Sequence, residues 1–175
     1  MDPRRLWWLG GCAYLLAGLI GFAGPVVNVN ISAPAFAQGQ PIPIKYGYHQ
    51  QNISPELRIA NVPADARSLV LIVDDPDSPS GVWTHWLVWN LPPNTTDIPE
   101  GKLPPGAHEA KNSFGNDRYD GPAPPSGTHR YFFHLYALDT TLSLSSGSDR
   151  AALLAAIQGH VVGTGETFGT YSASP

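Results

Sequence analysis

The sequence is poor in cysteine and in charge. Cys12 is the only cysteine of the 175 residues, and it lies in an apolar N-terminal segment. The rest of the chain can therefore form neither a disulfide framework nor a cysteine-based zinc site. Charged residues make up only 14%, the formal net charge is −4, and the ten basic residues are scattered. Because nucleic-acid binding needs a clustered basic face, no nucleic-acid partner is expected.

Glycine and proline are abundant instead, with 18 of each. Both residues favour turns, so their number predicts a β-rich fold with long loops. Apolar residues make up 42% of the chain, which favours a folded domain over disorder. A length of 175 residues suits one domain with a sizeable core.

The N-terminus has the three parts of an export signal. An Arg-Arg pair at 4–5 precedes a nearly uninterrupted apolar run over residues 6–24, and a stretch of small residues then ends in Ala-Phe-Ala at 35–37. This pattern predicts a secretory signal peptide over residues 1–37 and a domain over residues 38–175. The domain is then exported, either periplasmic or secreted.

Two alternatives to cleavage remain for this segment. The apolar run over residues 6–24 approaches the roughly 20 residues that span a bilayer, so it could serve as an uncleaved membrane anchor. The residues that end at Cys12 resemble a lipoprotein signal, but too little apolar sequence precedes the cysteine and too much follows it.

Hydrophobic patterning predicts a mostly β domain with one late helix. Residues 68–74 form a continuous aliphatic run, which is typical of a strand covered on both faces. A helix is expected over residues 149–158, where Ser148 or Asp149 caps its start and Gly159 ends it. Because regular helices do not separate the strands, a doubly wound parallel sheet is disfavoured. The other expected strands cover residues 42–48, 57–62, 82–91, 129–138 and 166–172.

The strand expected over residues 82–91 carries a histidine near its start. Alternation along a strand places Trp83, His85, Leu87 and Trp89 on one face. A lone histidine is more often a core residue than a ligand-binding group. His85, however, follows a loop rich in glycine, proline and aspartate, and binding groups concentrate on such loops.

A second histidine and two aspartates complete a candidate anion site. Alternation places His129 and Tyr131 on one face of their strand, while Asp75 and Asp77 follow the buried strand over residues 68–74. A carboxylate can fix the tautomer of an imidazole and raise its basicity. The imidazoles, the tyrosine hydroxyl and backbone N–H groups of the preceding glycine-rich loop could then hold an anion.

Several motifs stand in order along the chain. They are Asp75-Pro76-Asp77-Ser78-Pro79, Trp83-Thr84-His85-Trp86 and the stretch from Gly121 to Tyr131, accompanied by Asn52-Ile53-Ser54-Pro55 and Ser113-Phe114-Gly115. Together they resemble the phosphatidylethanolamine-binding proteins, also called Raf kinase inhibitor-like proteins, and in particular their bacterial branch. The resemblance runs from about residue 42 to residue 172.

The resemblance implies a fold and a ligand class. The fold is a large antiparallel sheet packed with a smaller sheet, with Greek-key connections and few helices. The ligand is a small anion or zwitterion, such as a phosphoethanolamine lipid head group, bound in a small surface cavity without a cofactor. By matching position, the ligand-binding residues are Asp75, Asp77, Trp83, His85, Ala123, Pro124, Pro125, His129 and Tyr131.

The chain departs from the family pattern in three places. Ala123 stands where many relatives carry glycine or cysteine, and Asp120 is expected to add a negative charge near the mouth of the cavity, which would weaken the binding of simple anions. The C-terminal helix of animal members has no counterpart after Tyr171. A kinase-inhibitory role is therefore not expected.

The sequence favours a binding protein over an enzyme. Ser126 and His129 invite comparison with a catalytic triad, but Ser126 lies in a Pro/Gly turn without the strand-to-helix elbow of the hydrolases. A metal site built from the aspartates and histidines lacks tight ligand spacing, so neither catalytic nor metal-binding residues are predicted. The alternative function, by analogy with relatives, is inhibition of a protease or another exported enzyme. The helix over residues 149–158 could also support a homodimer.

Overall fold

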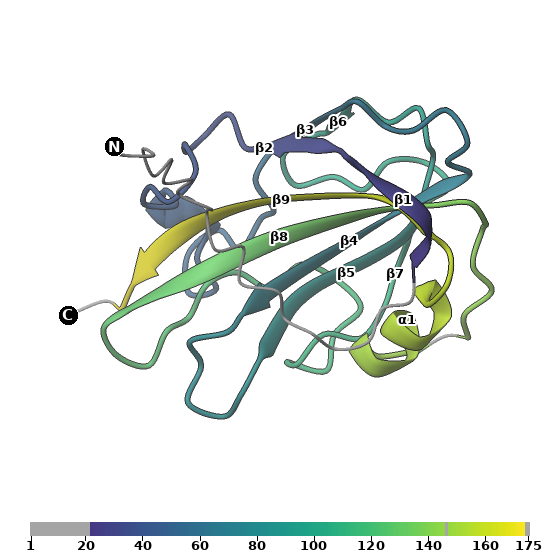
Figure 1. Ribbon diagram of the computed structural model, residues 1–175. Helices are drawn as coiled ribbons and strands as arrows, with labels where there is room; N and C mark the ends of the chain where they lie inside the picture. Colours follow the sequence, from purple (N-terminus) through teal and green to yellow (C-terminus); the bar gives the residue numbers. More distant parts are fainter. Residues whose placement is uncertain (1–21, 146, 174–175) are drawn as a thin grey trace, which may run out of the picture.

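The computed structural model describes residues 22–145 and 147–173 as a mostly β domain (Figure 1). Within these residues, a six-stranded sheet has the order β1-β9-β8-β4-β5-β7 and a three-stranded sheet the order β2-β3-β6. The elements are β1 (Phe22–Asn28), β2 (Asn30–Ser32), a 3-10 turn (Ile44–Tyr46), β3 (Leu57–Ala60), β4 (Ser68–Asp75), β5 (Trp83–Leu91), β6 (Asp97–Ile98), β7 (His108–Glu109), β8 (Thr128–Leu138), α1 (Arg150–Ile157) and β9 (Val161–Ser172).

The large sheet contains a Greek key. β4, β5 and β7 are successive antiparallel neighbours, and β8 returns to pair with the free edge of β4, which gives the order β8-β4-β5-β7. The predicted mostly β fold with a larger and a smaller sheet is confirmed. The large sheet is not wholly antiparallel, however, because β1 pairs with β9 in parallel at its edge.

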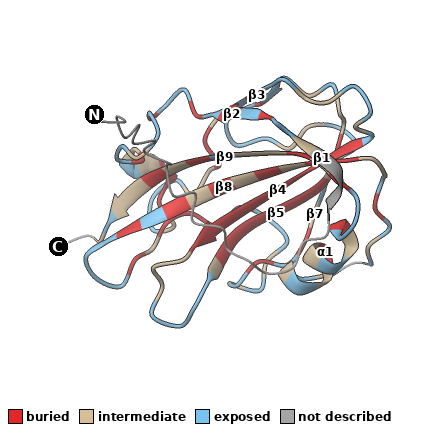
Figure 2. Cartoon of the chain, viewed as in Figure 1, coloured by how far each residue is buried: buried red, intermediate tan, exposed pale blue. Residues whose placement is uncertain are grey.

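The main core lies between the two sheets. Leu57, Ile59 and Ile98 of the small sheet pack against the inner face of the large sheet, where Leu71 and Phe133 are also buried. All eight residues of β4 are buried, as the uninterrupted aliphatic run predicts for a strand covered on both faces. Figure 2 shows β4 and β5 as the most continuously buried strands of the molecule.

A second, smaller core lies on the outer face of the large sheet under α1. Leu153 and Ile157 of the helix pack there on Val70, Ile72 and neighbouring side chains. The Asp149 side chain accepts a hydrogen bond from the backbone N–H of Ala152 at 3.0 Å, which caps the helix as expected. The helix covers one end of the sheet, and the loops that follow β4 and precede β8 lie at the other end (Figure 1).

Two expected elements differ from the structure. Residues 42–48 do not form a strand: Pro43 precedes a 3-10 turn that buries Tyr46, and the strand-like contact is limited to a bridge between Pro41 and Thr170. The fixed geometry of the two prolines and their missing N–H groups explain why a ladder does not form. β9 begins at Val161, five residues earlier than expected, because a long antiparallel partner in β8 supports its weak glycine-rich start.

The segment before Ala37 contributes to the main core. Val29, Ile31 and Phe36 are buried there, and β2 pairs with β3. The predicted cleavage after Ala37 would therefore remove core side chains, and it stays a prediction. Residues 6–21 of the apolar segment, including Cys12, lie outside the described residues. In the part of the chain that the structure describes, no helix has the length and apolar character needed to cross a membrane.

We predict that a chain beginning at Gln38 is mostly unfolded, whereas a chain beginning at Phe22 folds. Loss of a buried phenylalanine or isoleucine side chain alone costs about 2–5 kcal/mol. Removing Val29, Ile31 and Phe36 together approaches the whole stability of a typical domain, which is about 5–15 kcal/mol. Urea unfolding followed by circular dichroism compares the two chains, and equal midpoints would contradict the prediction.

Candidate ligand-binding pocket

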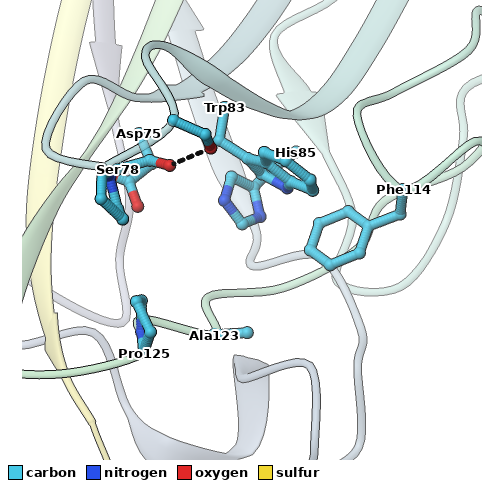
Figure 3. A pocket seen from close by; sticks show the side chains of 9 residues that line it. Asp75, Ser78, Trp83, His85, Phe114, Ala123 and Pro125 are labelled. Atoms are coloured by element: carbon cyan, nitrogen blue, oxygen red, sulfur yellow. Dashed lines mark hydrogen bonds between the residues drawn. The ribbon is translucent and has the colours of Figure 1, made fainter.

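A cavity of about 210 Å³ opens at the end of the large sheet opposite α1. It lies where β4 ends and β5 begins, and the loop before β8 closes its far side. Figure 3 shows the imidazole of His85 near the middle of this space, with Phe114 to one side and Ala123 and Pro125 across from it. The lining residues are Asp75, Ser78, Pro79, Ser80, Trp83, His85, Phe114, Ala123 and Pro125.

A β-bulge determines where His85 points. Val73 of β4 pairs with Trp86, but the next residue, Asp74, pairs with Thr84, so His85 is an extra residue in β5. The expected alternation with Leu87 and Trp89 is therefore wrong. Those two residues lie in the outer core under α1, whereas the His85 ring lies 5.1 Å from the ring of Tyr131 on the inner face.

Asp75 and His129 form a buried pair behind the cavity. The Asp75 Oδ2 atom lies 2.7 Å from Nδ1 of His129, and the two side chains are 5% and 9% exposed. Asp75 Oδ1 also accepts the backbone N–H of Asp77 at 2.8 Å. Because an ionised carboxylate only accepts hydrogen bonds, Nδ1 of His129 carries the proton in this pair. The carboxylate thus fixes the imidazole tautomer, as the sequence predicts.

His85 is held in the same way by a backbone carbonyl. Its Nδ1 lies 2.7 Å from the carbonyl oxygen of Asp120. Burial lowers the pKa of His85, and this effect outweighs the raising influence of the Asp120 carbonyl, the Asp75 charge, the Gly121 backbone and the Asp74 charge. The ring is therefore neutral at pH 7.

The mouth of the cavity has an aromatic side. The ring of Phe114 lies edge-on to both Trp83 and His85, with a centroid separation of 5.4 Å in each case. Tyr48 stacks on the same Phe114 ring at 4.7 Å, which holds it in place. An aromatic wall beside the Asp75 carboxylate is suited to an ammonium group.

Tyr131 places a hydroxyl behind the cavity wall. Among the described residues it is the one buried side-chain nitrogen or oxygen without a hydrogen-bond partner. Burial raises the pKa of this phenol, and the nearby Asp75 charge raises it further, so it stays a donor at neutral pH. A buried donor without a partner costs free energy.

The predicted residues separate into two groups. Asp75, Trp83, His85, Ala123 and Pro125 line the cavity. His129 and Tyr131 are buried just behind it, and Pro124 is also buried.

Asp77 has a different partner. Its carboxylate binds the side chain of Arg130 at 2.7 and 2.9 Å and also accepts the Arg130 backbone N–H at 2.9 Å. These contacts lower the pKa of Asp77, the Arg130 side chain contributing most. The pair clamps the loop after β4 to the start of β8, and Asp77 is absent from the cavity wall that the described residues form.

Sequence reasoning did not assign four residues of the wall: Ser78, Pro79, Ser80 and Phe114. Ser78 and Pro79 belong to the motif that begins at Asp75, and Ser80 directly follows it, so that motif carried a signal for this stretch. Phe114 is part of the Ser113-Phe114-Gly115 motif, but nothing in its local sequence shows that this loop folds back onto β5.

Asp120 does not lie at the mouth, contrary to expectation. Its side chain is fully buried among a set of hydrogen-bond donors and is not part of the cavity wall. Burial alone would raise the pKa of this carboxyl, but the hydrogen bonds and the nearby arginine together lower it. The donors are Asn116 at 2.8 Å, Asn112 at 2.9 Å, Asn52 at 3.0 Å and Arg118 at 3.2 Å.

Gly121 allows the rim of the cavity to lie close to the 3-10 turn. A Cβ atom at this position would stand 2.0 Å from the carbonyl oxygen of Tyr46, so no other residue fits without a shift of backbone. The Gly121 N–H donates to the Asn52 side chain at 2.7 Å, and the Pro122 carbonyl accepts from Tyr48 at 2.9 Å. These contacts hold Ala123 at the cavity.

Comparison with known proteins assigns the family. A model of the family described as phosphatidylethanolamine-binding protein matches residues 32–172. The chain belongs to the phosphatidylethanolamine-binding protein family. Among curated relatives in this family, a UPF0098 protein of Methanothermobacter thermautotrophicus is 47% identical over 82% of this chain and 98% of its own length.

Other family members extend this assignment. A putative lipoprotein, LppC, of Mycobacterium tuberculosis is 37% identical over 82% of this chain and 72% of its own length. Among solved structures, a putative phosphatidylethanolamine-binding protein homologue of Chlamydia trachomatis has a TM-score of 0.80 at 41% identity, and covers 84% of this chain and 99% of its own. Escherichia coli YbcL has a TM-score of 0.79 at 27% identity, with coverage of 85% and 100%.

The described residues of this family member include no cluster of three or more histidine, cysteine, aspartate or glutamate side chains arranged to hold a metal ion.

We predict that Asp120→Ala destabilises the domain by about 3 kcal/mol, because the side-chain amides of Asn52, Asn112 and Asn116 lose their shared acceptor. Asp117→Ala is the matched control: it removes an exposed neighbouring carboxylate and should change the free energy of unfolding by less than about 0.5 kcal/mol. Urea unfolding measures both, and equal effects would contradict the role given to Asp120.

The lowered pKa of Asp120 also predicts the direction of a pH effect. The folded state favours the ionised carboxylate, so its stabilising contribution is complete at pH values well above 3.8, the ordinary pKa of the group. This contribution is lost as the pH falls through the lower pKa that the group has in the folded state. The stability difference between the native chain and Asp120→Ala should therefore shrink in acid.

Proposed function

We propose that this protein is a non-catalytic binding protein whose pocket receives a small zwitterionic phosphate ester, such as O-phosphorylethanolamine or the phosphoethanolamine head group of a lipid. The observation that supports this most directly is the combination of polar groups in one small cavity. Asp75 and His85 line its inner wall, and Trp83 and Phe114 form its aromatic side. An ammonium group fits the carboxylate and the aromatic rings, and a phosphate group can form a hydrogen bond with the imidazole.

The size of the cavity supports a head group rather than a larger molecule. Its volume of about 210 Å³ lies below the roughly 300–1,000 Å³ of pockets that enclose drug-sized ligands. Pro79 and Pro125 on its rim restrict the conformations of the loops there. A lipid would therefore present its head group to the pocket and leave its acyl chains outside.

The side chains around the cavity support binding rather than turnover. The hydroxyls of Ser78 and Ser80 contact each other at 3.1 Å, and no described base forms a hydrogen bond with either one. An activated nucleophile needs such a base within hydrogen-bond reach. His129 is hydrogen-bonded to Asp75, and Ser126 is exposed on the loop before β8. We therefore assign no catalytic role to these residues.

We further propose that the chain is exported, with the apolar segment over residues 6–24 acting as a signal or an anchor. The naming of the Mycobacterium tuberculosis relative as a putative lipoprotein supports this proposal. β1 enters the large sheet beside the start of β9, at the α1 end. The cavity is lined by residues from the end of β4 and the start of β5, and these strand ends lie at the opposite end of the sheet (Figure 1). An anchored form would thus hold the cavity away from its own bilayer, in reach of soluble ligands.

Titration with O-phosphorylethanolamine tests the binding function. We expect saturable binding by isothermal titration calorimetry and a change in tryptophan fluorescence, because Trp83 lines the cavity. In His85→Ala the dissociation constant should rise about 10- to 100-fold, the cost of losing a hydrogen bond to a charged group.

His160→Ala is the matched control for this titration. His160 is exposed, pairs with Asp139 at 2.9 Å and lies beside β9's first residue, at the end of the sheet remote from the cavity. Its loss should leave the dissociation constant unchanged. If the native chain and His85→Ala bind equally, the pocket assignment is wrong. If the native chain binds neither O-phosphorylethanolamine nor phosphatidylethanolamine vesicles, the proposed function fails.

A further inference from the structure

The hydrogen-bonding state of His85 restricts what a ligand can offer. Its Nδ1 lies 2.7 Å from the carbonyl oxygen of Asp120, and a carbonyl oxygen can only accept, so the proton of the neutral ring is on Nδ1. Nε2 then carries a lone pair and no proton. No hydrogen bond within the described residues uses Nε2, and His85 is part of the cavity wall. The pocket therefore presents an acceptor at this position.

The Asp120 carbonyl is held in place, so His85 cannot easily change to the tautomer that carries the proton on Nε2. The backbone N–H of Asp120 donates to the His85 carbonyl oxygen at 3.0 Å, and the Asn112 side chain donates to the same oxygen at 3.3 Å. The Asp120 side chain is itself fully buried and is held by Asn52, Asn112 and Asn116. The residue whose carbonyl selects the His85 tautomer is thus held through both its backbone N–H and its side chain.

The charged groups around His85 add no donor to the cavity wall. Asp75, at the end of β4, is an acceptor already engaged with His129 on β8. Asp74 points to the other face of the sheet, where it binds Arg150 of α1 at 2.9 Å.

One donor near His85 is the Tyr131 hydroxyl, but it lies behind the wall. An unprotonated phosphate oxygen that approaches Nε2 would therefore place its own lone pair against the lone pair of this nitrogen. The Asp75 carboxylate, which is also an acceptor, lies beside Nε2.

We infer that His85, with its tautomer selected by the Asp120 carbonyl, makes this pocket specific for the protonated form of an oxyanion: a phosphomonoester binds as its monoanion, and its P–OH group donates to Nε2, whereas the diester head group of an intact lipid has no such proton to donate. The inference rests on the proposed function and specifies its ligand. Starting from the dianion in solution, one proton is taken up from water and lies between the ligand oxygen and Nε2, and no covalent bond between heavy atoms forms or breaks. His85 and the Asp120 peptide are thus specificity determinants.

The inference has a measurable consequence because phosphomonoesters lose their second proton at a pKa of about 6. Above this pH the dianion dominates in solution, so the formation of each complex must be coupled to the uptake of one proton. The dissociation constant of O-phosphorylethanolamine should then rise about tenfold for each pH unit above neutrality. At about pH 8, titrations in two buffers of different ionisation enthalpy should report an uptake of about one proton per ligand bound.

The nitrogen-15 resonances of the His85 ring locate this proton in the native chain. Without ligand, Nδ1 should have the chemical shift of a protonated and Nε2 that of an unprotonated ring nitrogen. With O-phosphorylethanolamine, the Nε2 signal should move toward the protonated position. A free protein with its proton on Nε2, or a bound one with an unchanged Nε2, would overturn the inference.

His85→Gln provides a second test, because a side-chain amide can turn its N–H₂ group to the ligand and donate without taking up a proton. We expect this variant to bind O-phosphorylethanolamine with a nearly flat pH profile and an uptake close to zero, whereas the remote control His160→Ala should keep the uptake of the native chain. Full uptake in His85→Gln would overturn the role of His85.

The two proposals fail in different ways. Binding by the native chain with no proton uptake and no pH dependence would overturn this inference and leave the proposed function standing. Absence of binding at every pH would overturn the proposed function itself.

Discussion

The buried Asp120 carboxylate is the interaction on which the candidate site depends. Its two oxygens accept hydrogen bonds from three asparagine side chains and one arginine, and these donors come from two loops, one that carries Asn52 and one that carries the other three. A buried charge is tolerated only when it is well paired, so the loops must assemble around it. Its backbone also bonds to β5 at His85, so the same residue that joins the loops orients the pocket imidazole.

The bulge in β5 is the second constraint on the site. An extra residue in one strand reverses the face to which the following side chains point, and such irregularities are common beside binding sites. Here Thr84 joins Asp74 and Arg150 on the helix side of the sheet, while His85 joins Tyr131 on the inner side. One position in β5 therefore contributes to the ion pair on the helix side of the sheet. The next position along the strand contributes to the cavity on the inner side.

The division of roles between the ends of the large sheet follows from this arrangement. At one end, α1 and the outer core stabilise the start of β9. At the other end, polar groups that are costly to bury line or back a small cavity, and the hydroxyl of Tyr131 has no partner among the described residues. Natural proteins retain such unsatisfied groups mainly where a ligand or water can pair with them. The outer core and the cavity therefore occupy opposite ends of the large sheet.

Much of the architecture was predictable from the sequence. The aliphatic run of β4, the helix α1 with its Asp149 cap and the strand β8 all follow from local patterns, and the ordered motifs indicate the family. The residue types that pair at the site, an aspartate beside a histidine, are also evident from the motifs alone.

The tertiary structure decided the rest. Alternation alone places His85 with Leu87, because a bulge depends on the register of β5 against β4 and leaves no trace in the strand itself. The sequence does not show that Asp120 turns inward, since its partners Asn52, Asn112 and Asn116 come together only when the loops fold. By itself, the sequence determined many of the chemical groups that the pocket contains. Long-range pairing decided which way they point.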